Sequence, residues 1–103
     1  MSDHHETTLD ADGFEWDENK RVTNLAKHGF DFEDVTVVFL EPHIDFALKY
    51  RAEPRRQATG VVDGRCVAVI YTMRGRTIRI ISARRARENE ERVYRATLAR
   101  GDP

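Results

Sequence analysis

The chain has 103 residues, of which 40% are hydrophobic and 34% are charged, and its formal net charge is −1. This length suits one domain with one modest core. The sequence has no apolar run near the roughly 20 residues that a membrane-spanning helix needs, and no signal-peptide pattern, so we expect a cytoplasmic protein. The one cysteine, Cys66, excludes an internal disulfide, and its apolar surroundings favour a small buried side chain.

The charges are divided unevenly between the two halves of the chain. Residues 1–48 contain three Lys and Arg against twelve Asp and Glu, a net charge of −9, whereas residues 49–103 contain fourteen against six, a net charge of +8. Thirteen of these fourteen cations are arginine. Such a division favours a basic surface that attracts polyanions. The alternative is that the two halves neutralise each other within the fold.

The first 40 residues predict a leader, a short strand and two helices. Residues 1–13 are polar and acidic, and we expect them to be mobile. A short strand is predicted at residues 14–16, followed by a helix over residues 18–27 that Asp17 caps and Gly29 ends. The apolar positions of this helix are Val22, Leu25 and Ala26. A second helix is predicted from residue 31 to Phe39, because its apolar residues recur at three and four positions before Pro42 stops it.

After Pro42 the apolar residues alternate, which predicts strands. Four strands are expected at residues 44–48, 57–62, 65–73 and 77–83. The short links between them, above all Asp63-Gly64, indicate antiparallel pairing. A last helix from Arg87 to Ala99 is expected to turn Val93, Tyr94, Thr97 and Leu98 toward the core. The sequence thus predicts a small α+β domain over residues 14–99, with an antiparallel sheet, two N-terminal helices, one C-terminal helix and a tail at 100–103.

Arginines gather where the last strand meets the last helix. The segment IRIISARRARENEERVY, residues 78–94, holds Arg79, Arg84, Arg85 and Arg87 within nine residues. A guanidinium group binds phosphate or carboxylate oxygens in a two-point fashion. We therefore predict an open anion site on the sheet face that the helices leave uncovered. Ion pairs with the neighbouring glutamates are the alternative.

Three sequence patterns carry a resemblance to a known family. They are N-x-x-K-H-G-x-x-F from Asn24, ISAR-x-A from Ile81, and E-x-x-x-Y ending at Tyr94. Over residues 14–98 the chain resembles the BrnT toxins of bacterial type II toxin–antitoxin systems. The resemblance implies a RelE-like fold, RNA cleavage that inhibits translation, and neutralisation by a BrnA-like ribbon–helix–helix antitoxin that also binds promoter DNA. Two positions depart from the family pattern: Pro54 before the third strand, and Arg87 where a capping Thr is common.

RNA cleavage without a metal needs an acid, a base and cations beside the phosphate. The candidate catalytic residues are Arg84, His28, Arg79 and Lys27, and the candidate substrate-binding residues are Arg55, Arg85 and Tyr94. His28 suits proton transfer because both forms of an imidazole are accessible near neutral pH, although it could instead cap the helix carbonyls. Tyr94 could equally belong to the core. Glu91 could serve as a base, but an ion pair with an arginine of its helix is simpler.

The sequence has no ligand spacing for a metal and no phosphate-binding glycine loop, so we expect no metal and no cofactor. The expected partners are an RNA substrate and the antitoxin. We expect the antitoxin to cover the same arginine-rich face that would receive the RNA. The competing interpretation is a non-catalytic basic module that docks an antitoxin or nucleic acid, because the same arginines would serve either role.

Overall fold

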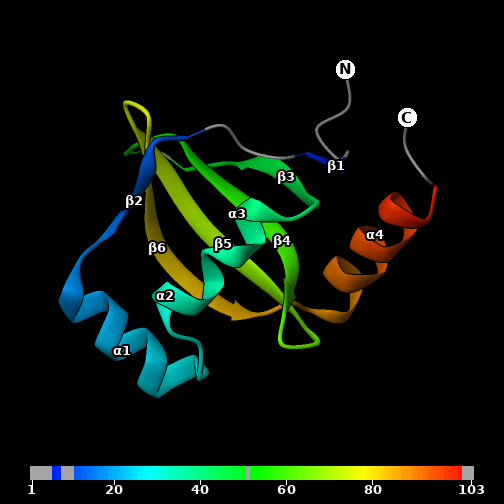
Figure 1. The fold of residues 1–103 in the computed structure, drawn as a ribbon, viewed down its shortest axis with the longest axis horizontal. Coiled ribbons are helices and arrows are strands. Elements are labelled where there is room, and N and C mark those ends of the chain that lie inside the picture. The colour runs from blue at the N-terminus through cyan, green and yellow to red at the C-terminus, as the bar shows by residue number, and fades with distance from the viewer. Residues whose placement is uncertain (1–5, 8–10, 51, 101–103) are drawn as a thin grey trace.

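A computed structural model of the protein describes residues 6–7, 11–50 and 52–100 (Figure 1). Within these residues, six strands form one sheet in the order β1-β3-β4-β5-β6-β2. The strands are β1 (Glu6–Thr7), β2 (Gly13–Trp16), β3 (His43–Leu48), β4 (Arg55–Val62), β5 (Arg65–Arg74) and β6 (Thr77–Arg85). The helices are α1 (Glu18–His28), α2 (Phe32–Val35), α3 (Val37–Leu40) and α4 (Glu88–Ala99). The predicted small α+β domain is confirmed.

Strands β3 to β6 are sequential antiparallel neighbours, as the short links between them predicted. The β4–β5 turn places Asp63 at φ 50° and Gly64 at φ 78°, the left-handed conformation that a tight hairpin requires. Strand β2 lies at the far edge and runs parallel to β6. The sequence predicted β2 as a strand but not this parallel edge, because a local pattern does not specify a strand's partner.

The predicted second helix is divided at Thr36 into α2 and α3, so the prediction of one continuous helix is wrong. The run of β-branched residues from Val35 to Val38 has low helix propensity. In addition, the Thr36 hydroxyl donates to the carbonyl of Glu33 at 2.8 Å, a local bond that competes with the helical pattern.

The helices divide between the two faces and one edge of the sheet (Figure 1). Helices α2 and α3 cover one face, where Phe32, Val35 and Phe39 are almost fully buried against β4, β5 and β6. On the other face α4 packs against β3 and β4, and Tyr94 joins Ile44 in a smaller cluster. Helix α1 lies beside β6. The part of the second face over β5 and β6 is left without a covering helix among the described residues.

Two predicted apolar faces differ from the structure. On α4, Tyr94 and Thr97 are buried, but Val93 is 40% exposed. On α1, Val22 and Leu25 are 54% and 40% exposed, because the helix turns Asn24 toward the sheet instead. Helical periodicity identified both helices, but it does not identify the face that packs.

The chain ends are described only in part. The predicted mobile leader falls largely on residues 1–5 and 8–10, which lie outside the described residues, as does most of the tail. Within the described part, β1 pairs with β3 and Asp12 forms an ion pair with Arg76 at 3.1 Å. No helix in the described ranges is long and apolar enough to cross a membrane.

Candidate functional site: a basic pocket between α1 and β6

Helix α1 is held against β6 by one buried side chain, Asn24. Its Nδ2 donates to the carbonyl of Ala83 at 2.8 Å, and its Oδ1 accepts from the Ala83 amide at 3.1 Å. The same Nδ2 donates to the carbonyl of Phe30 at 3.1 Å, just past the end of the helix. Asn24 is 7% exposed, and these bonds satisfy its amide without water. They fix the position of α1 along the strand.

Both ends of α1 are capped in the way that the sequence predicted. The Asp17 carboxylate accepts from the amides of Asn19 and Lys20 at 2.8 and 3.3 Å. Gly29 has φ 79°, and its amide donates to the carbonyl of Leu25 at 2.9 Å. Because Gly29 ends the helix directly after His28, the side chains of the last turn are presented at a fixed corner of the molecule.

A pocket of about 470 Å³ lies between this helix and β6. Its lining residues are Asp17, Asn19, Lys20, Thr23, Asn24, Lys27, His28, Ile81 and Ser82. The structure therefore brings together two of the predicted catalytic residues, Lys27 and His28, and adds Lys20 to them. All three side chains are exposed, and none forms an ion pair within the described part of the chain. The cations of this pocket remain available to an anion.

A β-bulge places two of the predicted arginines, Arg79 and Arg84, on the same sheet face as Ser82 of the pocket. The pairing of β5 with β6 shifts after Ile70, which is opposite Ser82, to Tyr71, which is opposite Ile80, so Ile81 is the extra residue. Without this residue, Arg79 and Arg84 would point to opposite faces, because five positions separate them. With it, both lie on the second face. Strand β6 also continues through Arg85, whereas the sequence predicted its end at residue 83, so Arg84 lies within the strand and not just beyond it.

The prediction of open guanidinium groups is wrong for Arg79 and Arg84 of the arginine cluster, and also for Arg55. Arg84 forms a two-point ion pair with Glu90 of α4, with N–O distances of 2.8 and 2.9 Å. Arg79 pairs with Glu15 at 2.8 Å across the β2–β6 edge. Arg55 pairs with Glu53 at 3.0 Å and stacks on the ring of Tyr50, with its Cζ 3.8 Å from the ring centroid. Each acid lies beside its arginine on a neighbouring strand, helix or loop, which the charge sum of the sequence did not reveal.

Glu90 is the centre of a small polar network at the start of α4. Its carboxylate accepts from Gln57 Nε2 at 3.1 Å and from the backbone amide of Arg87 at 2.8 Å, in addition to Arg84. The Arg84 hydrogen bonds, followed by those from Arg87 and Gln57, lower the pKa of Glu90 to about 2. The bond from the Arg87 amide supplies the N-terminal cap that the arginine side chain, which has no acceptor, does not.

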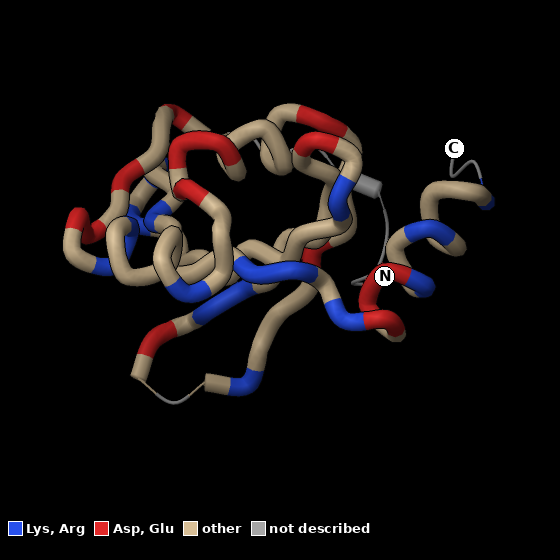
Figure 2. Tube along the Cα trace, turned by 90° about the horizontal axis from the view of Figure 1, so that it is seen from below, with Lys and Arg blue, Asp and Glu red and all other residues tan. Residues whose placement is uncertain are grey.

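The remaining predicted residues are separated from the pocket or have another role. Arg85 is exposed at the end of β6 and has no ion pair in the described residues. Tyr94 is 7% exposed and packs in the cluster beneath α4, as the alternative interpretation predicted. Glu91 pairs with Arg95 of its own helix at 2.8 Å. Figure 2 shows that most acidic residues follow the upper side of the molecule in that view, while basic residues are concentrated along its middle and lower parts.

Sequence reasoning missed Lys20 and Asn24. Lys20 precedes Lys27 by seven residues, two helical turns, so a shared helix face was the available signal. Asn24 is a weak helix former in a helix interior, and such a residue often makes a specific hydrogen bond. Among the described residues, no group of three or more His, Cys, Asp or Glu is placed to hold a metal ion.

The fold and the pocket define a class of small α+β domain with a basic pocket at the edge of its sheet. Residues 16–90 match the family model described as ribonuclease toxin, BrnT, of type II toxin–antitoxin system. This match covers most of the chain, which therefore belongs to the BrnT family of ribonuclease toxins, as the resemblance indicated. None of the curated proteins matches the chain.

Proposed function

We propose that this chain is a metal-independent endoribonuclease toxin that cleaves RNA at the α1–β6 pocket and thereby inhibits translation. The observation that carries the proposal is the pocket itself, in which Lys20, Lys27 and His28 gather without acidic ion-pair partners among the described residues. A BrnA-like ribbon–helix–helix antitoxin neutralises the toxin, and the toxin reaches promoter DNA only through that antitoxin.

The reaction requires two proton transfers and stabilisation of negative charge. The 2′-oxygen of the RNA attacks the adjacent phosphorus and loses its proton to a base, while the bond from phosphorus to the 5′-oxygen breaks and that oxygen gains a proton. The products are a 2′,3′-cyclic phosphate and a 5′-hydroxyl. We assign one of the two proton transfers to His28. A positioned acid or base accelerates such a reaction by roughly 10²–10⁴-fold. Lys20 and Lys27 stabilise the charge on the phosphate oxygens.

Arg84 has a narrower role than a free guanidinium would have. Of its five N–H donors, two bind Glu90 and a third reaches the Arg85 carbonyl at 3.2 Å. The Nε–H and one Nη2–H remain for a phosphate oxygen. Arg84 therefore contributes a fixed, partly neutralised cation beside the pocket, and Arg79 does the same further along β6. Arg85, Arg55 and Tyr94 have no direct catalytic contact in this proposal.

The test is the chemistry of the cut ends. Purified protein is incubated with a labelled RNA in EDTA, and the products are analysed for their termini. The proposal predicts cleavage that leaves 2′,3′-cyclic phosphate and 5′-hydroxyl ends. Products with 5′-phosphate ends, or cleavage only when Mg²⁺ is restored, would overturn it.

A second candidate function is a non-catalytic module that docks nucleic acid or an antitoxin through the same basic face. The ion pairs of Arg79 and Arg84 favour this alternative, because they limit the positive charge offered to a transition state. The two functions differ at His28. If His28→Ala loses toxicity but keeps partner binding, the nuclease is favoured, whereas joint loss of toxicity and partner binding favours a docking role.

A further inference from the structure

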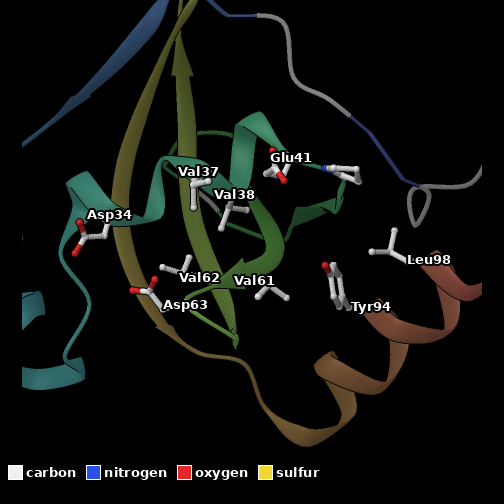
Figure 3. A pocket seen from close by; sticks show the side chains of 10 residues that line it. Asp34, Val37, Val38, Glu41, Val61, Val62, Asp63, Tyr94 and Leu98 are labelled. Atoms are coloured by element: carbon white, nitrogen blue, oxygen red, sulfur yellow. The ribbon is translucent and has the colours of Figure 1, made fainter.

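A second hollow lies on a different part of the molecule. A groove of about 600 Å³ runs between α3, the end of the β4–β5 hairpin and α4 (Figure 3). Its lining residues are Asp34, Val37, Val38, Glu41, Pro42, Val61, Val62, Asp63, Tyr94 and Leu98. None of these residues lines the α1–β6 pocket. The groove is therefore a separate surface that the proposed catalysis does not use.

The floor of the groove is apolar and only partly covered. Figure 3 shows valines of α3 and β4 facing Tyr94 and Leu98 of α4 across the hollow. Val37, Val61 and Leu98 are half-buried, so part of each side chain contacts solvent. Partly exposed apolar groups that line one concave surface gain free energy when a partner covers them.

The edge of the groove is acidic, and its described lining residues include no Lys or Arg. Asp34, Glu41 and Asp63 are exposed, and none of them forms an ion pair within the described residues. By contrast, Glu15, Glu53 and Glu90 on the second sheet face each bind an arginine. An apolar hollow with an uncompensated acidic edge is complementary to a segment with apolar side chains flanked by Lys and Arg.

We propose that this groove receives a basic amphipathic helix of the protein's antitoxin. The apolar side chains of one helix face, spaced three and four residues apart, enter the groove, and the flanking cations approach Asp34, Glu41 and Asp63. The inference rests on membership of a type II toxin–antitoxin family and does not require the catalytic assignments. It moves the main antitoxin contact away from the arginine-rich face on which the sequence had placed it.

Other occupants of the groove fit its charge poorly. RNA phosphates would be repelled by the three acids. Residues 1–13 of the chain contain four Asp and Glu and no Lys or Arg, so the leader carries the same sign of charge as the groove. A second copy of the chain remains an outcome that the experiment distinguishes.

The experiment compares two charge reversals of equal size. Asp34→Lys with Glu41→Lys changes the groove, and Glu33→Lys with Glu88→Lys changes two exposed acids outside it. The antitoxin encoded in the same operon is purified alone, and its Kd for each toxin variant is measured at several salt concentrations. The groove variant is expected to bind at least about tenfold more weakly, with a smaller salt dependence, than the control variant. Equal affinity of the two variants would overturn the proposal.

Two further readouts separate the possible failures. The groove variant should keep the wild-type rate of RNA cleavage and the wild-type unfolding midpoint, because the groove and the pocket share no residue. Cleavage lost together with antitoxin affinity would contradict a separate docking surface. Wild-type toxin that self-associates, and ceases to do so in the groove variant, would identify a second copy as the occupant and overturn the antitoxin assignment. If wild-type toxin cleaves no RNA, the proposed function fails and the affinities still test the groove.

Discussion

Asn24 and Ala83 exchange hydrogen bonds in both directions, at 2.8 and 3.1 Å, across the junction of α1 and β6. Strand β2 pairs with β6 only as far as Ile80, so beyond that point β6 has no neighbouring strand on this edge. The side-chain amide of Asn24 takes the place of a strand backbone there. In this way one helix residue supplies hydrogen-bond partners to the backbone of Ala83 at the sheet edge, and it also sets the position of Lys27 and His28.

Replacing Asn24 by alanine should therefore damage both stability and activity. The change leaves the Ala83 amide and two carbonyls without partners in a buried site, which costs about 2–3 kcal/mol. Urea unfolding measures the loss, and RNA cleavage at a temperature where the variant is folded measures its effect on the pocket. Val22→Ala, which changes an exposed residue of the same helix outside the pocket, is the control and should change stability by less than about 0.5 kcal/mol. An Asn24→Ala variant as stable and active as the control would contradict the anchoring role.

The Glu90 network predicts a specific loss of stability in acid. Hydrogen bonds from Arg84 lower the pKa of Glu90 to about 2 from its usual 4.5, so the folded state favours the ionised carboxylate. This contribution is complete above about pH 4.5 and is lost as the pH falls toward 2. Glu90→Gln should therefore be less stable than wild type at pH 7 by roughly 1–2 kcal/mol, allowing for partial screening by solvent, and the difference should vanish near pH 2.

Unfolding free energies measured from pH 2 to 7 for wild type and Glu90→Gln test this prediction. Glu88→Gln is the matched control, because Glu88 is exposed in the same helical turn and forms no ion pair within the described residues. A difference between wild type and Glu90→Gln that does not depend on pH would show that Glu90 is not held ionised by Arg84.

Cys66 should be chemically inert in the folded protein. It is 1% exposed, and burial raises the pKa of its thiol to about 11, so the reactive thiolate is scarce at pH 8. A thiol-specific reagent should leave the native protein unmodified at pH 8 and label one thiol after unfolding in urea. Rapid labelling of the native protein would contradict the packing of Cys66 beneath α4.

Most of the secondary structure could be predicted because its signals are local. Asp17 and Gly29 bound α1, and Asp63-Gly64 sets the β4–β5 hairpin, through backbone preferences of the residues themselves. The division of the second helix at Thr36 has a local cause too, but β-branched residues within an apolar helical pattern give two conflicting signals. The parallel pairing of β2 with β6 depends on contacts between residues more than 60 positions apart.

The candidate site was less predictable, for two physical reasons. First, the bulge at Ile81 reverses the alternation of β6, and nothing in the sequence IRIISARR marks which residue is unpaired. Second, the availability of an arginine depends on which acids the fold brings beside it. Arg84 meets Glu90 only because α4 turns back over the sheet. Lys27 and His28, by contrast, form no ion pair with any described residue, because Gly29 ends their helix at an exposed corner.

Single-turnover RNA cleavage in EDTA by a His28→Ala variant tests the central claim most directly. Lys49→Ala, which removes an exposed cation outside the pocket, serves as the control. If the α1–β6 pocket is the catalytic site, His28→Ala loses at least about 100-fold in rate while its unfolding midpoint and antitoxin affinity stay at wild-type values, and the control cleaves normally. Cleavage by His28→Ala at the wild-type rate would contradict the assignment of this pocket, and joint loss of cleavage and antitoxin affinity would favour the docking module.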